Sequence, residues 1–534
     1  MSDAGAGAPQ DGPESTSAGV RCVAKFLKAL SPVLALSLLA FQLVLPWTAR
    51  YYMSMDGPSH LYNARVIGEV LFKPSSPYSQ FYRLRSALTT NWGTILLFNL
   101  VSRLTVTYAE PIVATLSVLA AFSSFFYLLR SLDPKAPCTP VLNFLTLTWF
   151  LWAGFYNFYL GMALFTLAVG YYIRNSARLS WRNATALSLL LVATYFTHIL
   201  PAALAILTVL IVGVWLHGFR KSSLRPPLLA AMIPACLLMG SFVLASREGI
   251  HVTPDILLAW RNFPTHVFSE TYQANPSGTW LYPVMLGFLL LGILLLRRTE
   301  WSSARGGIVA ATAICFGLYL VAPSHGFGGD DINTRVAWAV FILGIAVAAS
   351  GARMQMLGAP LALYVTGFLG VQLYRSMNWN VRNVSRAVDD YARATDAIPA
   401  GATAVQIHFD TSAVSRQYGY RGLTLDPLYH ADSWTAARQH FVDLSDYQAL
   451  SRLFALEFRP PITDQQRSDL WNLESDNQSS LASLHRLLDD FPPAIDYVLV
   501  FGDPGSQTLD LEKQMDPVAT AGTPPFLRVY RRHK

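Results

Sequence analysis

The chain has 534 residues, of which 52% are hydrophobic and 14% are charged, whereas about a quarter of the residues of a soluble protein are charged. This composition, with a mean hydropathy of +0.33, excludes an ordinary soluble enzyme, because one buried core cannot hold so many apolar residues. We therefore expect an α-helical polytopic membrane protein. The net charge of +7 is interpreted first as a topology signal, so no nucleic-acid partner is expected.

Residues 1–28 are expected to form a disordered cytoplasmic tail. The first twenty are mostly Gly, Ala, Ser, Pro and acidic residues without periodicity, a composition typical of disorder. Basic residues then precede the apolar run 29–48, which ends in Leu45-Pro46-Trp47. No small-residue cleavage pattern follows this run, so it predicts an uncleaved membrane anchor rather than a signal peptide.

The four cysteines, Cys22, Cys138, Cys236 and Cys315, lie far apart, without a Cys-x-x-Cys pair or a histidine at metal-ligand spacing. This spacing supports neither a zinc site nor a disulfide framework. We expect no cofactor, and the spacing gives no support for a divalent metal.

Apolar runs long enough to cross a bilayer, or nearly so, recur along the first 375 residues. The run 184–217 is too long for one span and carries His198 and Pro201, so it predicts two helices that meet there. The segment 92–108 is short and polar in places, and we expect it to be interfacial or re-entrant. The sequence then predicts about eleven spans, at 29–48, 110–130, 139–156, 158–174, 184–217 (two), 227–246, 279–296, 306–323, 336–352 and 357–375.

The basic residues between the spans fall on one side under this assignment. That side collects Arg130, Lys135, Arg174, Arg178, Arg182, Arg220, Lys221, Arg225, Arg297, Arg298, Arg305 and Arg353. The positive-inside rule makes it the cytoplasmic side. The N-terminus is then cytoplasmic, and residues after about 376 lie outside.

The chain is thus expected to divide into a transmembrane module, residues 29–375, and a tail domain, residues 376–534. In the tail, helical patterns alternate with the strand-like runs Thr403–Phe409, Asp496–Phe501 and Phe526–Tyr530. Proline and glycine turns separate them. We expect a small extracytoplasmic α/β domain.

The first candidate site is Asp56 with His60, in the run 55–63 that follows the first span. Pro58 suits the first turn of a helix, which would place Asp56 at the helix N-terminus. Asp56 is either an N-cap or a general base, since deprotonating a hydroxyl nucleophile needs a carboxylate within hydrogen-bond reach. His60 is either a substrate-binding residue or a hydrogen-bonded interfacial histidine.

The second candidate site is the glycine-rich run 324–335, with His325, Asp330, Asp331 and Arg335. Its glycines allow close approach of a ligand, and an arginine binds phosphate bidentately. The alternative is an ordinary flexible loop in which Asp331 pairs with Arg335 and both are solvated surface charges.

Further polar residues collect on the outer side. His198 is either functional or bonded to a neighbouring carbonyl, and the aromatic turn 154–161 is interpreted as a belt that anchors the membrane interface. The interiors of the spans carry almost no charge, which argues against a proton-coupled transporter. The loop 247–278 adds the outer candidates His251, Asp255, His266 and Glu270. In the tail, four residues are either acceptor contacts or, by default, ordinary surface residues: Asp410, Arg421, Asp426 and His430.

Together, an N-inside bundle of about eleven spans, the acidic Asp56 in the first outer loop and an external tail domain resemble the GT-C glycosyltransferases, including the bacterial mannosyl- and aminoarabinosyl-transferase relatives. Members commonly carry an acidic pair in that loop, whereas Gly57 follows Asp56 here. The resemblance implies a bacterial inner-membrane enzyme that transfers a sugar from a polyprenyl-phosphate donor to a lipid or glycan acceptor of the cell envelope. It also implies that Asp56 is the base and that Arg335 with a histidine binds the donor phosphate. The segment 92–108 would line the entrance through which the lipid donor reaches the site, in contact with membrane lipids.

Three other functions stay open at this point. A non-catalytic scaffold would need the tail domain but not Asp56. A transporter of envelope lipid or polysaccharide would need a polar route across the membrane. A polymerase or ligase of lipid-linked glycans would share the outer polar residues but depend on other loops.

Overall fold

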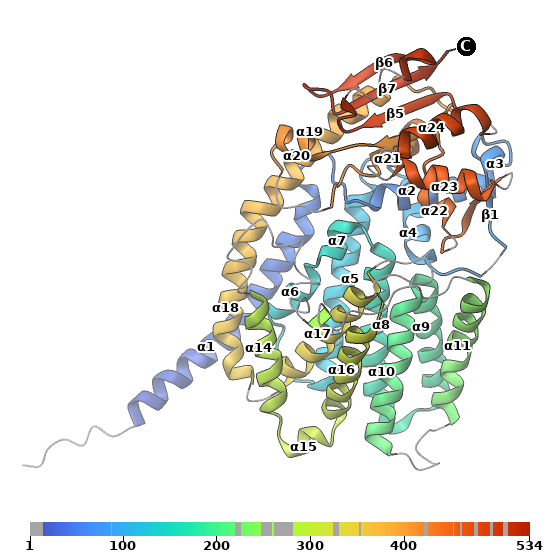
Figure 1. Cartoon of the computed structure of the whole chain (residues 1–534). Coiled ribbons are helices and arrows are strands. Elements are labelled where there is room, and N and C mark those ends of the chain that lie inside the picture. Colours follow the sequence, from blue (N-terminus) through green and yellow to red (C-terminus); the bar gives the residue numbers. More distant parts are fainter. Residues whose placement is uncertain are drawn as a thin grey trace, which may run out of the picture.

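The computed structural model of the chain is a bundle of helices with a small α/β domain at one end (Figure 1). It describes residues 14–86, 88–218, 226–246, 259–260, 281–323, 331–351, 354–420, 425–451, 453–459, 462–474, 479–491, 495–505 and 511–533. The expected class, a helical membrane protein with a small C-terminal sheet region, is confirmed. His251, Asp255, His266, Glu270, His325, Asp330 and Arg421 lie outside the described residues.

The bundle is built from helices of very different length, with one short strand. Its elements are α1 Glu14–Val44, η1 Leu45–Trp47, α2 Gly57–Phe72, α3 Tyr78–Phe81, β1 Tyr82–Leu84, α4 Trp92–Ser102, α5 Ala109–Leu132, α6 Val141–Thr146, α7 Trp149–Ala153, α8 Tyr156–Asn175, η2 Ser176–Arg178, α9 Trp181–Thr197, α10 Ile199–His217, α11 Pro226–Ser246, α14 Leu281–Leu294, α15 Arg298–Trp301, α16 Ala304–Val321, α17 Ile332–Ser350 and α18 Met354–Gln372.

Six helical stretches among the described residues are long and apolar enough to cross a membrane. They are Ala29–Trp47, Ala109–Leu132, Ile199–His217, Pro226–Ala245, Ala304–Val321 and Ile332–Ser350. The chain is therefore a multi-pass membrane protein. The number of eleven crossings stays a prediction.

The run 184–217 is split as expected. α9 ends at Thr197 and α10 begins at Ile199, with His198 in extended conformation between them. The His198 side chain caps α10, because its Nδ1 accepts a hydrogen bond from the Leu200 N–H at 3.2 Å. The interruption thus satisfies one of the free N–H groups that a helix start exposes.

The run 139–156, one of the expected spans, is broken into two short helices. α6 and α7 are separated by Leu147 and Thr148, and Thr148 has extended dihedral angles. The carbonyl of Leu145 accepts from Trp338 Nε1 at 3.1 Å, and that of Thr146 accepts from the Tyr159 hydroxyl at 2.6 Å. Buried side chains thus satisfy carbonyls that the break frees, which is what irregular backbone inside a membrane module requires.

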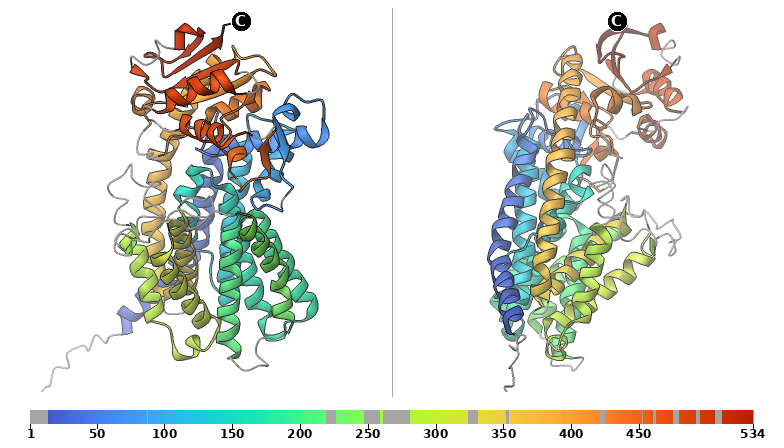
Figure 2. Two further views of the ribbon diagram at one scale, coloured as in Figure 1. Left: turned by 45° about the vertical axis from the view of Figure 1, so that its right-hand side comes forward. Right: turned by 90° about the vertical axis from the view of Figure 1, so that its left-hand side faces the viewer.

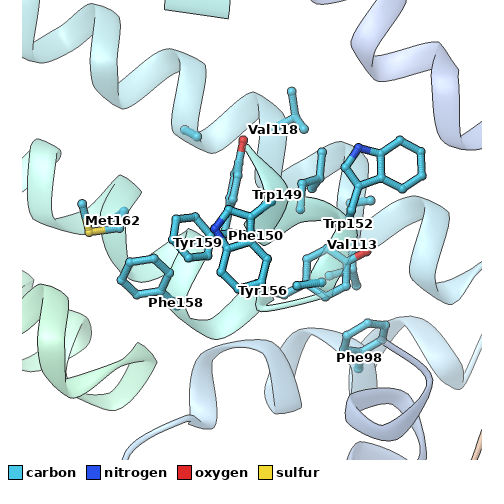
Figure 3. Close-up of a cluster of buried hydrophobic side chains, with 14 of the residues drawn as sticks. Phe98, Val113, Val118, Trp149, Phe150, Trp152, Tyr156, Phe158, Tyr159 and Met162 are labelled. Carbon is cyan, nitrogen blue, oxygen red and sulfur yellow. The ribbon is translucent and has the colours of Figure 1, made fainter. Parts of the chain in front are cut away.

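The aromatic turn 154–161 is part of the core rather than an interfacial belt. Tyr156, Phe158 and Tyr159 are at most 1% exposed, and they belong to the buried cluster beside α7 and α8 in Figure 3. Phe150 lies 5.3 Å from Trp338 between ring centroids. The tyrosine hydroxyls have protein partners, Glu110 for Tyr156 and Thr146 for Tyr159, so these rings need no contact with water.

A continuous helical path leads from the bundle into the C-terminal domain. α18 is followed by the π-helical turn η4 Leu373–Met377 and then by α19 Asn378–Thr395, which Figure 2 shows as one long rod. The apolar face of α19, which includes Val381, Val384 and Val388, is buried. The domain therefore begins on a helix that also packs in the membrane module.

The C-terminal domain contains a five-stranded sheet in the order β3-β2-β5-β7-β6. β2, β3 and β5 are parallel, and β7 is antiparallel to both of its neighbours. Three of its strands coincide with the expected runs. The remaining elements are β2 Thr403–His408, α20 Ser412–Tyr418, α21 Ala431–Gln439, β3 Val442–Asp443, α22 Tyr447–Leu450, β4 Leu456–Phe458, α23 Asp464–Leu473, α24 Ser479–Asp490, β5 Tyr497–Phe501, β6 Met515–Ala521 and β7 Leu527–Arg532.

The first outer loop and the C-terminal domain are joined. β1 pairs antiparallel with β4, so that Tyr82 lies opposite Phe458, and α2 packs on α21 and α22. In Figure 1 these elements lie between the bundle and the sheet. The segment that follows Asp56, from α2 to β1, is therefore packed between the membrane module and the domain.

Candidate functional site

Asp56 lies in the turn that leads into α2. Its backbone occupies the N-cap position of α2, but its side chain makes no capping hydrogen bond, so the N-cap interpretation of this carboxylate was wrong. Instead, Asp56 Oδ2 accepts a hydrogen bond from the Tyr447 hydroxyl at 2.9 Å. Asp56 Oδ1 lies 3.6 Å from Nε2 of His430. Residue 56 is only 8% exposed, so this carboxylate is held at the junction of module and domain.

The backbone of this turn is fixed by the end of α7 and by the glycine that follows it. The N–H groups of Met55 and Asp56 donate to the carbonyls of Trp152 and Ala153 at 3.2 and 2.9 Å. Gly154 follows, with φ of +77°, and a Cβ there would lie 2.4 Å from Ser54 Oγ and 2.5 Å from the Gly57 nitrogen. The approach needs a glycine for both its dihedral angles and its missing side chain.

Glu110, in the first turn of α5, holds the same turn through hydrogen bonds. Its Oε1 accepts from the Ser54 N–H at 2.9 Å, from the Ser54 hydroxyl, and from the Tyr156 hydroxyl at 3.1 Å. A Cβ on Gly57 would lie 2.0 Å from that same oxygen. Glu110 is therefore a positioning residue for the Asp56 turn.

His60, one turn into α2, faces the same cluster. Its Nδ1 lies 2.9 Å from the side-chain nitrogen of Gln448, which also donates to the Tyr447 hydroxyl at 3.3 Å. Burial lowers the pKa of His60 to about 4, so its imidazole is neutral at pH 7. The sequence was right to group His60 with Asp56, because a chain of three contacts links them through Gln448 and Tyr447.

His430 is a buried member of the site rather than the surface residue that its position in the tail domain suggested. It is 7% exposed, and its ring stacks on that of Tyr447 with centroids 4.8 Å apart. Burial, together with the imidazoles of His408 and His60, lowers the pKa of His430 to about 3. At neutral pH it therefore faces Asp56 as a neutral dipole and not as a cation.

A layer of buried carboxyl groups behind the site ties α2 to the domain. Asp446 Oδ1 accepts from Asn63 Nδ2 at 2.8 Å and from the Ser59 hydroxyl at 3.3 Å. Burial and the nearby Asp443 charge raise the pKa of Asp446 to about 8. Burial raises the pKa of Asp443 to about 6, and its backbone N–H donates to the Tyr62 hydroxyl at 2.9 Å.

Glu474, at the end of α23, is a further carboxyl group near the site, and the charge of Asp56 affects its pKa. Burial, then the charge of Asp56, raises the pKa of Glu474 well above its ordinary value. Its backbone carbonyl accepts from the Tyr429 hydroxyl. The described residues contain no group of three or more His, Cys, Asp or Glu side chains arranged to hold a metal ion.

A second cluster surrounds Arg335, near the start of α17. Its Nη1 lies 3.0 Å from His198 Nε2, and its guanidinium lies 4.6 and 5.2 Å from the ring centroids of Phe155 and Phe158. Arg335 is half-buried among these side chains. The expected pairing of Arg335 with a histidine is present.

Asp331 contributes to this cluster through its backbone. It adopts a left-handed conformation with φ of +55° at the N-cap of α17, and its carbonyl accepts from the Arg335 N–H at 3.0 Å. Phe155 follows Gly154, so one short turn contacts both the Asp56 turn and the Arg335 guanidinium. The two clusters are thereby linked through the start of α8.

Several residues of the site were not predicted from the sequence. Tyr447, Gln448 and Glu474 come from the tail domain, and Glu110 begins a span. Glu110 carried a usable signal, since an acidic residue in an apolar run is costly unless it has partners. Two other tail candidates make local hydrogen bonds instead. The exposed Asp410 accepts from the Ser412 N–H, and Asp426 accepts from the Leu428 N–H.

No protein-family model matches this chain, and no curated protein matches it. The fold and site therefore define the class directly: a multi-pass helical membrane protein whose C-terminal α/β domain closes over a buried aspartate at the end of the bundle.

Proposed function

We propose that this protein is an integral-membrane glycosyltransferase that transfers a sugar from a polyprenyl-phosphate donor to an acceptor hydroxyl of the cell envelope. The observation that carries the proposal is Asp56, a carboxylate that caps no helix and is oriented by Tyr447 where module and domain meet. A carboxylate fixed in this way at the membrane boundary suits a general base.

Asp56 accepts the proton of the acceptor hydroxyl in the proposed reaction. The acceptor oxygen forms a bond to the anomeric carbon of the sugar, and the bond from that carbon to the phosphate oxygen breaks. The polyprenyl phosphate leaves with the electron pair. Tyr447 holds the carboxylate in place, and the neutral imidazole of His430 lies beside it.

Arg335 binds the phosphate of the donor in this scheme, with His198 orienting the guanidinium. Negative charge grows on the leaving phosphate, so a cation at this point stabilises the transition state more than the ground state. The rings of Phe155 and Phe158 support a planar guanidinium better than they would a lysine. We assign His325, Asp330 and Asp331 to the same donor site because they lie in the run 324–335 that ends at Arg335.

The proposal includes the membrane in which the enzyme lies and its orientation there. The protein crosses the bacterial inner membrane about eleven times with a cytoplasmic N-terminus, and the domain after residue 376 faces outward. α15, which begins at Arg298 with Arg297 as its N-cap, lies at the end of the bundle opposite the sheet in Figure 1, and this supports the orientation under the positive-inside rule. Lipid-linked donors suit this outer site.

A non-catalytic scaffold is the second candidate, and the joint between β1 and β4 with the carboxyl layer behind α2 favours it. In that case the Asp56–Tyr447 bond would serve only to hold the domain on the bundle. Loss of Asp56 would then reduce stability without removing any transfer activity.

The test is sugar transfer in membranes that contain the full chain, with a panel of radiolabelled polyprenyl-phosphate sugars. The proposal expects a labelled envelope product together with stoichiometric release of polyprenyl phosphate, and no transfer from nucleotide sugars. Absence of transfer from every lipid-linked donor, by protein shown to be folded, would contradict it and favour the scaffold.

A further inference from the structure

α2 and α4 enclose a cavity of about 470 Å³ at the end of the bundle that carries the C-terminal domain (Figure 1). Asn99 Nδ2 donates to the carbonyl of Ala64 at 2.7 Å and fixes the two helices together. The cavity is lined by Arg65, Gly68, Glu69, Phe72, Lys73, Asn99, Ser102 and Arg103. It is separate from both clusters of the proposed site.

The lining residues carry an excess of positive charge. Three of the eight are cations, and Glu69 is the one carboxylate among them. Lys73 Nζ lies 2.9 Å from Glu69 Oε1. Arg65 contacts the imidazole of His440 at 2.9 Å, and burial together with the Arg65 charge lowers the pKa of His440, so this partner is neutral at pH 7.

Arg103 is held with its charge toward the cavity. Its Nη2 donates to Asn99 Oδ1 at 3.1 Å, and its guanidinium lies 5.4 Å from the centroid of the Phe72 ring. Both partners are uncharged. Two of the three cations are therefore positioned by neutral groups and retain their charge for an anion.

An exposed apolar stripe adjoins these cations. Leu96 and Leu100, four residues apart on α4, are 62% and 65% exposed, and Leu104 in the turn after α4 is 86% exposed. Leu71 and Phe72 at the end of α2 are 50% and 69% exposed. Residues four apart share one face of a helix. An apolar face flanked by cations is typical of a segment at the lipid interface.

An aromatic pair marks the level of that interface beside the stripe. Trp47, at the end of η1, stacks on Tyr108 at 6.1 Å between centroids, and each is 45% exposed. Tyr108 directly precedes α5, which packs on α4. Because exposed tryptophan and tyrosine side chains collect at the headgroup level, the cavity between α2 and α4 is expected at headgroup depth.

We propose that this cavity binds the phosphate headgroup of an anionic phospholipid, with an acyl chain along Leu96, Leu100 and Leu104. The three cations supply the charge complementarity, and the stripe accounts for a lipid rather than a free phosphate. The bound lipid stabilises α2, the helix that starts directly after Asp56. The inference does not rest on the glycosyltransferase proposal, and its test requires no sugar transfer.

The experiment measures the binding of short-chain phosphatidylglycerol to the purified full chain in detergent, by thermal shift and native mass spectrometry. Phosphatidylcholine and glycerol phosphate are the comparison ligands. Phosphatidylglycerol is expected to raise the Tm of the wild type and to remain bound, whereas the other two do neither.

The test variant carries Arg65→Gln, Lys73→Gln and Arg103→Gln. Its affinity for phosphatidylglycerol is expected to fall at least tenfold, because each basic residue near a lipid surface contributes about 1 kcal/mol. The matched control removes the same charge at the exposed residues Arg416, Lys513 and Arg531 of the C-terminal domain, which do not line the cavity, and is expected to bind as the wild type does.

Four results would overturn the proposal. They are wild-type affinity in the test variant, equal loss in the control, an equal shift with glycerol phosphate, and binding of polyprenyl phosphate in place of phosphatidylglycerol. If the triple variant does not fold, the double variant of the exposed Lys73 and Arg103 is judged by the same criteria.

Discussion

Tyr447→Phe isolates the contact that orients the proposed base. The change removes the hydroxyl that donates to Asp56 Oδ2 at 2.9 Å and leaves the ring that stacks on His430. A hydrogen bond to a charged group contributes about 1.5–3 kcal/mol. If that orientation is needed in the transition state, the transfer rate falls by about 10- to 150-fold, because each 1.4 kcal/mol corresponds to a factor of ten.

The assay compares kcat for sugar transfer with the Tm of each purified variant. Tyr418→Phe is the matched control, since the Tyr418 hydroxyl also donates to an aspartate, Asp390, in the same domain. It is expected to lower Tm comparably and to leave kcat unchanged. The reasoning is refuted if Tyr447→Phe transfers at the wild-type rate, or if both variants lose activity in proportion to stability.

Three further predictions concern packing, pH and phosphate binding. Gly57→Ala places a Cβ 2.0 Å from Glu110 Oε1 and is expected to cost about 1–3 kcal/mol of unfolding free energy by overpacking; Gly287→Ala, with open space around it, is the control, and equal Tm values for the two would contradict this. Asp446 has its pKa raised to about 8, so in the wild type the unfolded carboxyl ionises first and stability falls as pH rises from about 4 to 8; Asp446→Asn is expected to flatten this fall in Tm, and an unchanged slope would count against the buried carboxyl. Arg335→Lys is expected to lower kcat and kcat/KM for the lipid-linked donor at least tenfold with a smaller change in KM, because an ammonium ion lacks the planar pair of N–H donors that the guanidinium presents beside Phe155 and His198; an unaltered kcat/KM would remove Arg335 from the donor site.

Local sequence signals predicted several features of this protein well. His198 and Pro201 interrupt an apolar run that is too long for one span, and the chain breaks at His198. Short strand-like runs separated by proline and glycine turns marked β2, β5 and β7. Asp56 and His60 were grouped because Pro58 suits a helix start that places Asp56 at the helix N-terminus and His60 in its first turn.

Other features depend on contacts between distant residues and leave no local signal. The break between α6 and α7 is stabilised by Trp338, 193 residues away from the carbonyl of Leu145 that it bonds. Tyr447 reaches Asp56 across 391 residues. The aromatic turn 154–161 has the composition of an interfacial belt, and only the packing of Trp338 against it shows that these rings are buried.

The most direct test of the central claim is the rate of sugar transfer by purified Asp56→Asn, compared with the wild type at matched protein level and matched Tm. Asparagine keeps the shape of the side chain and an oxygen that accepts from Tyr447, but it cannot take a proton. Since general base catalysis contributes about 10²- to 10⁴-fold, the account predicts a loss of at least 100-fold. Transfer within a few-fold of the wild-type rate would contradict it and remove Asp56 as the base.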